Sequence, residues 1–250
     1  MRHPSPGRGV ALSVDLACAD YRDIGVALVV ADTDGSTESL SARALTVPFG
    51  GRPAVEPLAR WLRETADAVG AQCLCIDGPL GWKGPDTDSP HCRRSERLVR
   101  APGKTGLPPD GVKPRSYLGF TTFSIALFEA LRADGAWALP GQPDARPDAR
   151  LITESFPTAA WRALGLTPLM AKGRASAADI RDAAERLQRG TGIALEGVGT
   201  HDQLQAVAGG IAGAWWAAGH DTRVAFAGDP PFLLDGCWRE GYIMIPASPA

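Results

Sequence analysis

Four acidic residues stand where predicted strands end or a predicted helix begins. Asp15 in VALSVDLA, Asp77 in CLCIDGPLG and Glu154 in LITESFP each follow an apolar run, and Asp202 opens the helix of GTHDQLQAVAGG. Open α/β sheets place their sites at the ends of their strands. Carboxylates that converge there repel one another, and a divalent cation with oxygen ligands relieves the repulsion. The pattern favours metal-dependent chemistry on a phosphate ester.

Each of these acids also has a purely structural explanation. Asp15 suits a strand end, although it faces away from the Val/Leu side of its strand. Asp77 can form an Asp-Gly-Pro turn. Glu154 and Asp202 can stabilise the dipole at the first turn of a helix. For Asp202 the two readings agree, because a helix N-terminus keeps a carboxylate ionised, as a metal ligand must be.

Composition limits the class of protein. The 250-residue chain is 44% hydrophobic with a formal net charge of -2, and we expect one domain over residues 1–250. The weak charge gives no global basic field for nucleic acid, but it allows a local basic groove. No run approaches the ~18 apolar residues of a membrane span, and MRHPSPGRG lacks the apolar stretch of a signal peptide. We expect no membrane partner.

The cysteines indicate a reducing environment. Their number is odd and their spacing is not that of a disulfide framework, which predicts free thiols and a cytoplasmic protein. Cys73 and Cys75, taken with His91-Cys92, match no common zinc motif, so buried thiols are favoured. The five cysteines are Cys18, Cys73, Cys75, Cys92 and Cys237.

Hydrophobic periodicity predicts an α/β protein with a mixed sheet. Three successive strands joined by short connections indicate an antiparallel meander, and two later strands separated by helices indicate parallel pairing. Residues 1–8 are expected to form a loose tail, and residues 81–119 and 136–149 loop-rich insertions. The predicted strands are 9–17, 24–31, 42–49, 73–77 and 151–156, the predicted helices are 54–69, 90–99, 123–131, 157–164, 176–188 and 200–218, and two apolar runs at 223–227 and 242–245 form a C-terminal extension.

Three glycines interrupt the last predicted helix. Gly209, Gly210 and Gly213 each cost about 1 kcal/mol relative to alanine in a helix interior. Close approach of this helix to the sheet explains why they are there. The opposite stripe of the helix is apolar and is predicted to face the core, through Leu204, Val207, Ile211 and Trp215.

The order of the elements resembles the ribonuclease H-like fold, in which helices flank a mixed sheet. The motifs are similar to those of the DUF429 family, whose members are predicted ribonuclease H-like nucleases. The resemblance extends from residue 14 to residue 246. It is carried by VDLA at 14–17, IDGPLG at 76–81, RSERLVR at 94–100, ESFPTAAWRALG at 154–165, the Lys172-Gly173 step and HDQLQA at 201–206.

This resemblance implies a nuclease or phosphodiesterase that uses Mg²⁺ or Mn²⁺. Asp15 would bridge two cations, Asp77 and Asp202 would each hold one, and Glu154 would be a fourth ligand or orient the attacking water. Gln205 stands where relatives commonly carry a second aspartate, and glutamine is a weak, uncharged ligand. The alternative is therefore a catalytically weakened or inactive binding module on the same fold. His201 is either a proton relay or an ordinary first-turn residue.

Basic residues indicate a phosphate-binding surface. Arg94, Arg97 and Arg100 recur at helical spacing, and Lys172 follows in a predicted loop. Near a metal site such a stripe grips phosphates, so nucleic acid or a nucleotide is the expected partner. The competing interpretation is a solvated helix face, with Lys172 screening the carboxylates. A phosphotransferase of the actin and sugar-kinase type is disfavoured, because DLACADYRDIG lacks the expected glycine and threonine and the chain holds only one such half.

Overall fold

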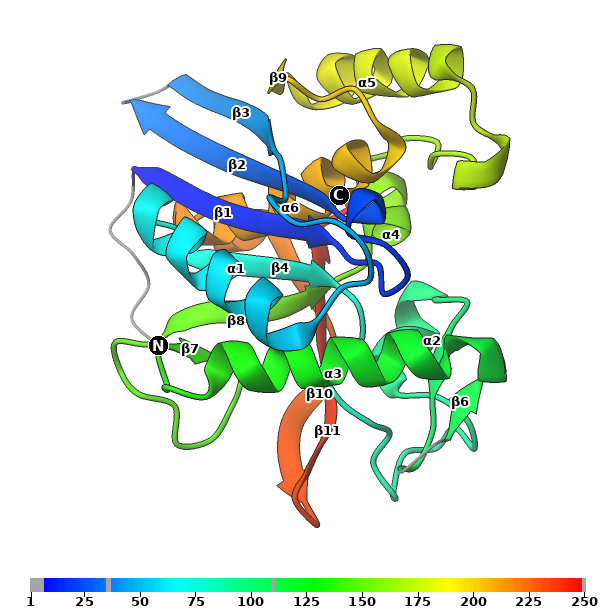
Figure 1. Ribbon diagram of the computed structural model, residues 1–250. Helices are drawn as coiled ribbons and strands as arrows, with labels where there is room; N and C mark the ends of the chain where they lie inside the picture. Colours follow the sequence, from blue (N-terminus) through cyan, green and yellow to red (C-terminus); the bar gives the residue numbers. More distant parts are fainter. Residues whose placement is uncertain (1–6, 35–36, 109–110, 249–250) are drawn as a thin grey trace.

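The computed structural model describes residues 7–34, 37–108 and 111–248, and Figure 1 shows its ribbon. Within these residues nine strands form one sheet and two short strands form a separate hairpin. The strands are β1 (Arg8–Asp15), β2 (Gly25–Asp34), β3 (Thr37–Leu45), β4 (Cys73–Asp77), β5 (Lys104–Thr105), β6 (Val112–Lys113), β7 (Trp137–Ala138), β8 (Arg150–Ser155), β9 (Ala194–Glu196), β10 (Val224–Leu234) and β11 (Cys237–Pro246). The α-helices are α1 (Val55–Val69), α2 (Arg94–Val99), α3 (Leu118–Arg132), α4 (Pro157–Ala163), α5 (Ala177–Thr191) and α6 (His201–Ala217).

The centre of the sheet has the predicted topology. β1, β2 and β3 form an antiparallel meander, and β4 joins β1 in parallel. β8 then joins β4 in parallel, giving the order β3-β2-β1-β4-β8. This is the strand order of the ribonuclease H-like fold, and the predicted fold class is confirmed. α1 lies between β3 and β4 in sequence, as a parallel crossover requires.

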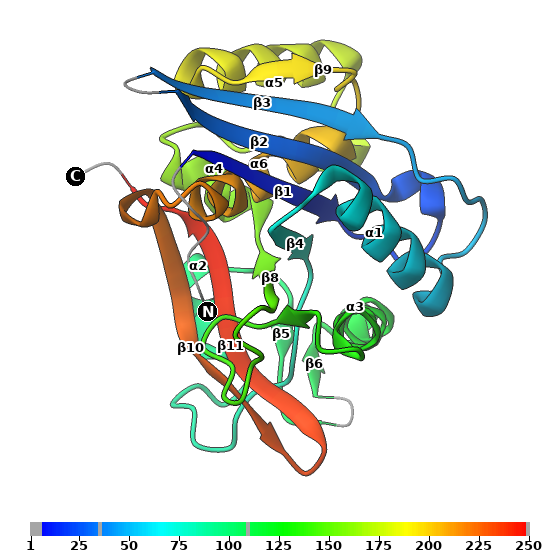
Figure 2. The same cartoon turned by 90° about the vertical axis from the view of Figure 1, so that its left-hand side faces the viewer.

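Both edges of the sheet carry strands that the sequence patterns did not resolve. The two late apolar runs are part of a long hairpin, β10–β11, and β11 extends the sheet in parallel with β8. Figure 2 shows this hairpin running away from the meander. At the other edge β9 pairs in parallel with β3, in a segment for which no strand was predicted.

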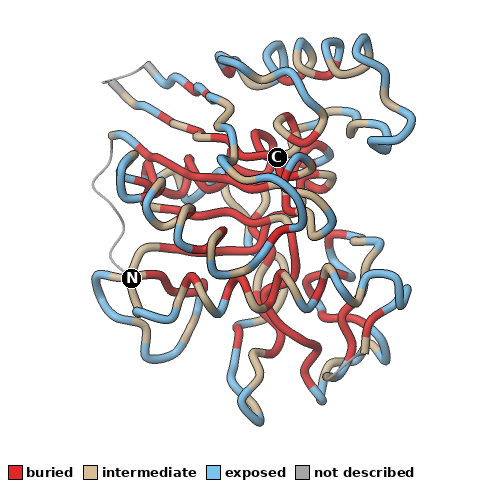
Figure 3. The backbone as a smooth tube through the Cα atoms, viewed as in Figure 1, coloured by how far each residue is buried: buried red, intermediate tan, exposed pale blue. Residues whose placement is uncertain are grey.

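The two faces of the sheet bury separate cores, and Figure 3 shows the central strands largely buried, with much of α1 and α5 exposed. In β1 the residues Val10, Leu12 and Val14 belong to the core beneath α1 and α3. Ala11, one position along, belongs to the core beneath α6. Because side chains alternate along a strand, Asp15 falls on the α6 face, as the alternation predicted.

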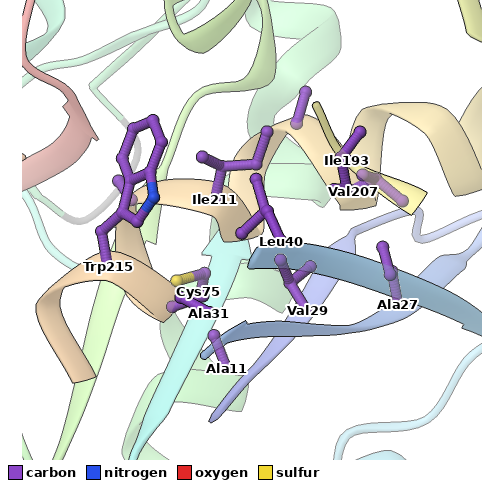
Figure 4. Close-up of a cluster of buried hydrophobic side chains, with 14 of the residues drawn as sticks. Ala11, Ala27, Val29, Ala31, Leu40, Cys75, Ile193, Val207, Ile211 and Trp215 are labelled. Atoms are coloured by element: carbon purple, nitrogen blue, oxygen red, sulfur yellow. The ribbon is translucent and has the colours of Figure 1, made fainter. Parts of the chain in front are cut away.

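The glycines of α6 allow the helix to lie directly on the strands. A Cβ atom at Gly213 would come within 2.4 Å of the Cys75 sulfur, and one at Gly210 within 2.7 Å of the Ser13 Cβ. Close approach to the sheet, the reason expected for these residues, is therefore confirmed. The predicted apolar stripe of α6 is buried in the same core, and Figure 4 shows Val207, Ile211 and Trp215 of this stripe among side chains from the strands.

The ends of several segments differ from prediction. Residues 1–6 of the predicted tail lie outside the described residues, and Arg8 already begins β1. The helix predicted over residues 90–99 begins only at Arg94, and β5, β6 and a 3-10 helix occupy other parts of the 81–119 insertion. The insertion at 136–149 contains β7. Among the helices that the structure describes, none is both long and apolar enough to cross a membrane.

Candidate metal centre

Asp15 and Asp77 meet at the ends of two adjacent parallel strands. They are register partners in the β1–β4 pairing, and their carboxyl groups are hydrogen bonded to each other. Burial, together with the charges of Asp77 and Asp202, raises the pKa of Asp15 well above its ordinary value. Burial and the charge of Glu154 raise the pKa of Asp77 to about 7, against the hydrogen bond with Asp15. Such a pair titrates as a unit, and it retains a proton at pH values where an exposed aspartate has none.

The N-terminus of α6 brings Asp202 to the same place. Thr200 caps the helix by accepting a hydrogen bond from the backbone N–H of Gln203. A Cβ atom at Gly25 would lie 2.1 Å from the backbone oxygen of Asp202, and Gly25 is the register partner of Asp15. A glycine at position 25 is therefore what lets the helix start beside Asp15. The sequence analysis did not identify this residue.

His201 joins the two carboxylates. One ligand atom from each of Asp15, His201 and Asp202 can be chosen so that all lie within 4.8 Å of one another. The ring Nε2 of His201 lies 2.9 Å from the backbone oxygen of Met170, which can only accept a hydrogen bond. Nε2 therefore carries a proton, and Nδ1 lies 3.3 Å from Asp202 Oδ1, where it donates a hydrogen bond when both ring nitrogens are protonated and offers a lone pair when the ring is neutral. This is the arrangement of a metal-binding histidine held by a backbone carbonyl.

Lys172 supplies a positive charge at this group. Its Nζ lies 2.5 Å from Asp202 Oδ2 and 2.7 Å from Asp23 Oδ1. Burial pushes the pKa of Asp202 upward, but hydrogen bonds from His201 and Lys172 outweigh burial and leave the pKa below its ordinary value. Of the two interpretations of Lys172, screening of the carboxylates is the contact seen in the structure.

Glu154 does not join this group, contrary to expectation. The register partner of Asp77 on β8 is Ser155, and Glu154 pairs with Ile76. Because in-register neighbours point to the same side of a sheet, Glu154 lies on the face of Ile76 and Asp77 on the opposite face. The Glu154 carboxylate instead accepts two hydrogen bonds from the Arg93 guanidinium, at 2.8 and 2.9 Å.

Arg93 is the functional candidate that the sequence analysis missed. Its side chain is completely buried and also donates to Glu96 Oε1 and Thr105 Oγ1. Burial by itself disfavours the charged guanidinium, but the carboxylates of Glu154 and Glu96 raise the pKa of Arg93 above its ordinary value. The useful signal was the Arg93-x-x-Glu96 spacing, in which the Glu96 carboxylate accepts a hydrogen bond of 3.1 Å from the backbone N–H of Arg93 at the start of α2.

The predicted arginine stripe is discontinuous. Arg94 is half-exposed and pairs with Asp229 at 3.3 Å, and Arg97 is exposed on α2. Arg100 lies beyond the helix, with a left-handed φ of 58°, so it does not continue the helical spacing. The reason is that α2 ends at Val99, one residue before the third arginine.

Gln205 is also engaged away from the carboxylates. Its Oε1 accepts a hydrogen bond of 3.0 Å from the indole N–H of Trp161 in α4, a residue with no exposed surface. A buried indole N–H needs such a partner. Cys73 and Cys75 are buried free thiols with sulfurs 3.7 Å apart beneath α6, as predicted.

The raised pKa of the aspartate pair predicts a pH dependence of stability without metal. The pKa of Asp77 rises from 3.8 in the unfolded chain to about 7 in the folded protein. Its contribution to stability is therefore fully present below pH 3.8 and is lost as the pH rises to and through the folded pKa of about 7. We therefore expect the difference in free energy of unfolding between Asp77→Asn and the wild type to grow in favour of the mutant from about pH 4 to pH 7, by up to about 1.4 kcal/mol per pH unit. Above about pH 7 this difference should be constant. Urea unfolding in EDTA across this range measures the difference. A difference that is flat with pH contradicts the assignment.

Comparison with known proteins places the chain in a family. The structure described as "Thermus thermophilus RuvC structure" matches with a TM-score of 0.42 and 11% identity, covering 85% of this chain and 97% of that one. No curated protein matches. The family model "Protein of unknown function (DUF429)" matches residues 19–230, a range that includes Asp77, Glu154 and Asp202 and begins just after Asp15. The chain belongs to the DUF429 family.

Proposed function

We propose that the protein is a metal-dependent phosphodiesterase acting on nucleic acid. The observation that carries the proposal is the grouping of Asp15, His201 and Asp202 at one sheet edge, with Asp77 hydrogen bonded to Asp15. Asp15, Asp77 and Asp202 would hold the cation through oxygen, and the Nδ1 of His201 would add a nitrogen ligand. Asp15 and Asp77, both partly buried, share a proton beside the buried Asp202, and this clustering of acids costs folding free energy that a bound cation would offset.

The ligands favour one cation rather than two. Glu154 is held by Arg93, and Gln205 is held by Trp161, so neither extends the group. A mixed set of carboxylates and one imidazole suits Mn²⁺ better than Mg²⁺, which prefers oxygen ligands in a strict octahedron. When bound, the cation would supply a Lewis acid and a water of lowered pKa.

The remaining groups would orient the reacting atoms. The hydrogen bond from His201 to Met170 fixes the ring so that Nδ1 points toward the carboxylates, and the neutral imidazole would offer its lone pair to the cation there. Lys172, now paired with Asp202, lies where an ammonium can neutralise charge on the phosphoryl oxygens. In the metal-free protein burial and the charge of Glu154 raise the pKa of Asp77 to about 7, and a bound cation would keep Asp77 ionised as a ligand.

Cleavage of labelled oligonucleotides tests this function. We expect Mn²⁺-dependent cleavage of at least one substrate among single-stranded, duplex and four-way-junction DNA and the corresponding RNA, and none in EDTA. Asp202→Asn should lower the rate at least ~100-fold, beyond the loss of an outer-shell partner. The exposed Asp32 lies on the adjacent strand β2, and Asp32→Asn serves as the control that keeps the activity.

A non-catalytic binding module is the second candidate. It is favoured by the internal pairing of charges, because Lys172 already compensates Asp202 and Arg93 already compensates Glu154. That function predicts no cleavage of any of these substrates and no response of stability to millimolar Mn²⁺. The same set of experiments therefore separates the two.

A further inference from the structure

A cavity of about 220 Å³ lies next to the metal centre, at the end of β4. The ends of β4 and β8, at Asp77 and Glu154, form part of its lining, and most of the remaining residues come from the 81–119 insertion and α3. Pockets for drug-sized ligands are typically ~300–1,000 Å³, so this volume suits a smaller group. None of the functions assigned above uses the cavity.

Three aromatic residues contribute to the walls: Tyr117, Phe120 and Phe156. A Cβ atom at Gly103 would lie 3.0 Å from the Tyr117 ring, so the ring packs against a bare backbone. Similarly, a Cβ at Gly78 would lie 3.3 Å from the edge of the Phe120 ring. Glycines at these two positions bring the rings close to the chain and leave the cavity open. Aromatic faces of this kind stack on flat, unpaired bases.

The polar groups of the cavity favour a neutral ligand with N–H donors. Glu96 and Glu154 line it, and both are hydrogen bonded to the buried Arg93, so the lining offers no free cation. The oxygens of Glu96 are fully engaged by Arg93 and Thr105, whereas Glu154 Oε1 accepts only one hydrogen bond and can accept another. Thr121 adds a hydroxyl. A free phosphate would meet three acidic side chains and no cation in this lining, whereas an N–H group of a base would find an acceptor at Glu154 or at the hydroxyl of Thr121.

Positive charge lies around the cavity rather than in it. Arg100 directly precedes the lining residue Ala101, and Lys104 lies between two more of them. The Lys104 ammonium donates to the backbone oxygen of the lining residue Glu96 at 3.4 Å, so this charge is close to the cavity, and Arg100 is exposed beside Ala101 in sequence. A base in the cavity would leave its phosphates near these cations and near the carboxylates of the metal centre.

We infer that this cavity binds one unpaired base of a single-stranded nucleic acid next to the phosphate held at the metal centre. The inference rests on the proposed function and specifies its substrate as a single-stranded or locally unpaired segment. A base within a duplex is stacked and paired, and it reaches such a cavity only after extrusion. The cavity therefore selects against intact duplex.

Binding without catalysis tests this inference. Fluorescence anisotropy is measured with labelled single-stranded 12-mers of DNA and RNA, with abasic strands of the same length and with the duplex, in EDTA and again in Ca²⁺. We expect the wild type to bind an intact strand more tightly than the abasic strand or the duplex. Tyr117→Ala should weaken binding of the intact strand roughly 5- to 150-fold, the range of one base–aromatic stack, and leave the abasic strand unaffected.

Matched variants keep the result interpretable. Phe232 is 38% exposed and Tyr117 37%, and Phe232 lies outside the cavity, so Phe232→Ala should leave binding unchanged. Tyr117→Phe keeps the aromatic face and should retain binding, while Tyr117→Leu keeps apolar volume and should lose it. Circular dichroism checks that each variant folds. If Tyr117→Ala does not fold, the binding measured with Tyr117→Leu decides the outcome.

Three results would overturn the inference. The wild type could bind intact and abasic strands equally, or it could bind no strand in either buffer. A folded Tyr117→Ala or Tyr117→Leu could also bind as tightly as the wild type. Failure of the proposed function is a distinct result. Base-dependent binding lost in Tyr117→Ala without any Mn²⁺-dependent cleavage supports the cavity and refutes the nuclease. Cleavage that is insensitive to Tyr117→Ala and to removal of bases supports the nuclease and refutes the cavity.

Discussion

Asp15→Asn is expected to raise the melting temperature of the metal-free protein at pH 8 and to abolish its stabilisation by Mn²⁺. In the wild type Asp15 is packed against Asp77 and Asp202, and the mutual repulsion of the three is relieved only in part by Lys172. An asparagine removes one charge, and its amide donates a hydrogen bond to the Asp77 carboxylate in place of the shared proton. The same change removes an oxygen ligand that a cation needs.

The size of the metal effect follows from linkage. A cation at 100 times its dissociation constant stabilises the folded state by about 2.7 kcal/mol. In a chain of this length that corresponds to a rise of roughly 5–10 °C in the melting temperature. Thermal unfolding in EDTA and over a Mn²⁺ titration measures it, with Asp32→Asn as the exposed control. An Asp15→Asn protein that keeps the full Mn²⁺ response would show that the cation binds elsewhere.

Arg93→Met is expected to destabilise the protein by about 3–5 kcal/mol, which is roughly 6–20 °C in melting temperature. The guanidinium of Arg93 is fully buried and pairs with Glu96 and Glu154, so a neutral side chain leaves two buried carboxylates without their cation. The cost arises from those stranded charges rather than from lost packing, because methionine fills much of the same volume.

The neighbouring arginine provides a matched control. Arg94 lies one position along the chain, is half-exposed and pairs with Asp229 at 3.3 Å. Exposed pairs contribute about 0–1 kcal/mol, so Arg94→Met should be close to neutral. Adding Glu154→Gln to Arg93→Met should recover part of the lost stability, because it removes one of the two buried carboxylates that lack a cation. Equal stability of Arg93→Met and Arg94→Met in urea unfolding would rule out the buried network as a source of stability.

Local patterns were enough to predict the centre of the fold and three of the acids. The alternation of side chains in β1 predicts which face of the sheet Asp15 lies on. The turn after β4 places Asp77 at the end of that strand, and the capping box of α6 places Asp202 in the first turn of that helix. Each of these signals spans a few adjacent residues. Convergence of Asp15 and Asp77 then followed from the strand order, because parallel strands end at the same edge, whereas Asp202 joins them through the packing of α6 against Gly25.

Glu154 was misplaced because β8 is buried on both faces. Leu151 and Ile152 belong to opposite cores, so the run has no polar side to show which residues face which helix. In such a strand a shift of one residue reverses every side chain, and a hydrophobic pattern does not fix the register. In the structure Ser155, and not Glu154, is therefore the neighbour of Asp77 on β8.

Arg93 and Gly25 were missed for a different reason. Arg93 meets Glu154 across 61 residues of sequence, and Gly25 meets the backbone of Asp202 from another strand. Both contacts exist only once the sheet and α6 have assembled. Propensity and spacing describe neighbours in sequence, so they give no sign of a partner that the fold supplies.

The position of a bound cation is the most direct test of the account. Crystals of the full chain soaked in Mn²⁺ at pH 8, with diffraction recorded at the manganese edge, locate the ion by its anomalous signal. The account predicts one peak among the oxygens of Asp15, Asp77 and Asp202 and the Nδ1 of His201, and no peak there in Asp15→Asn. A wild-type structure with manganese bound only at other sites, or with Lys172 still on Asp202 and no ion between the carboxylates at millimolar Mn²⁺, would contradict it.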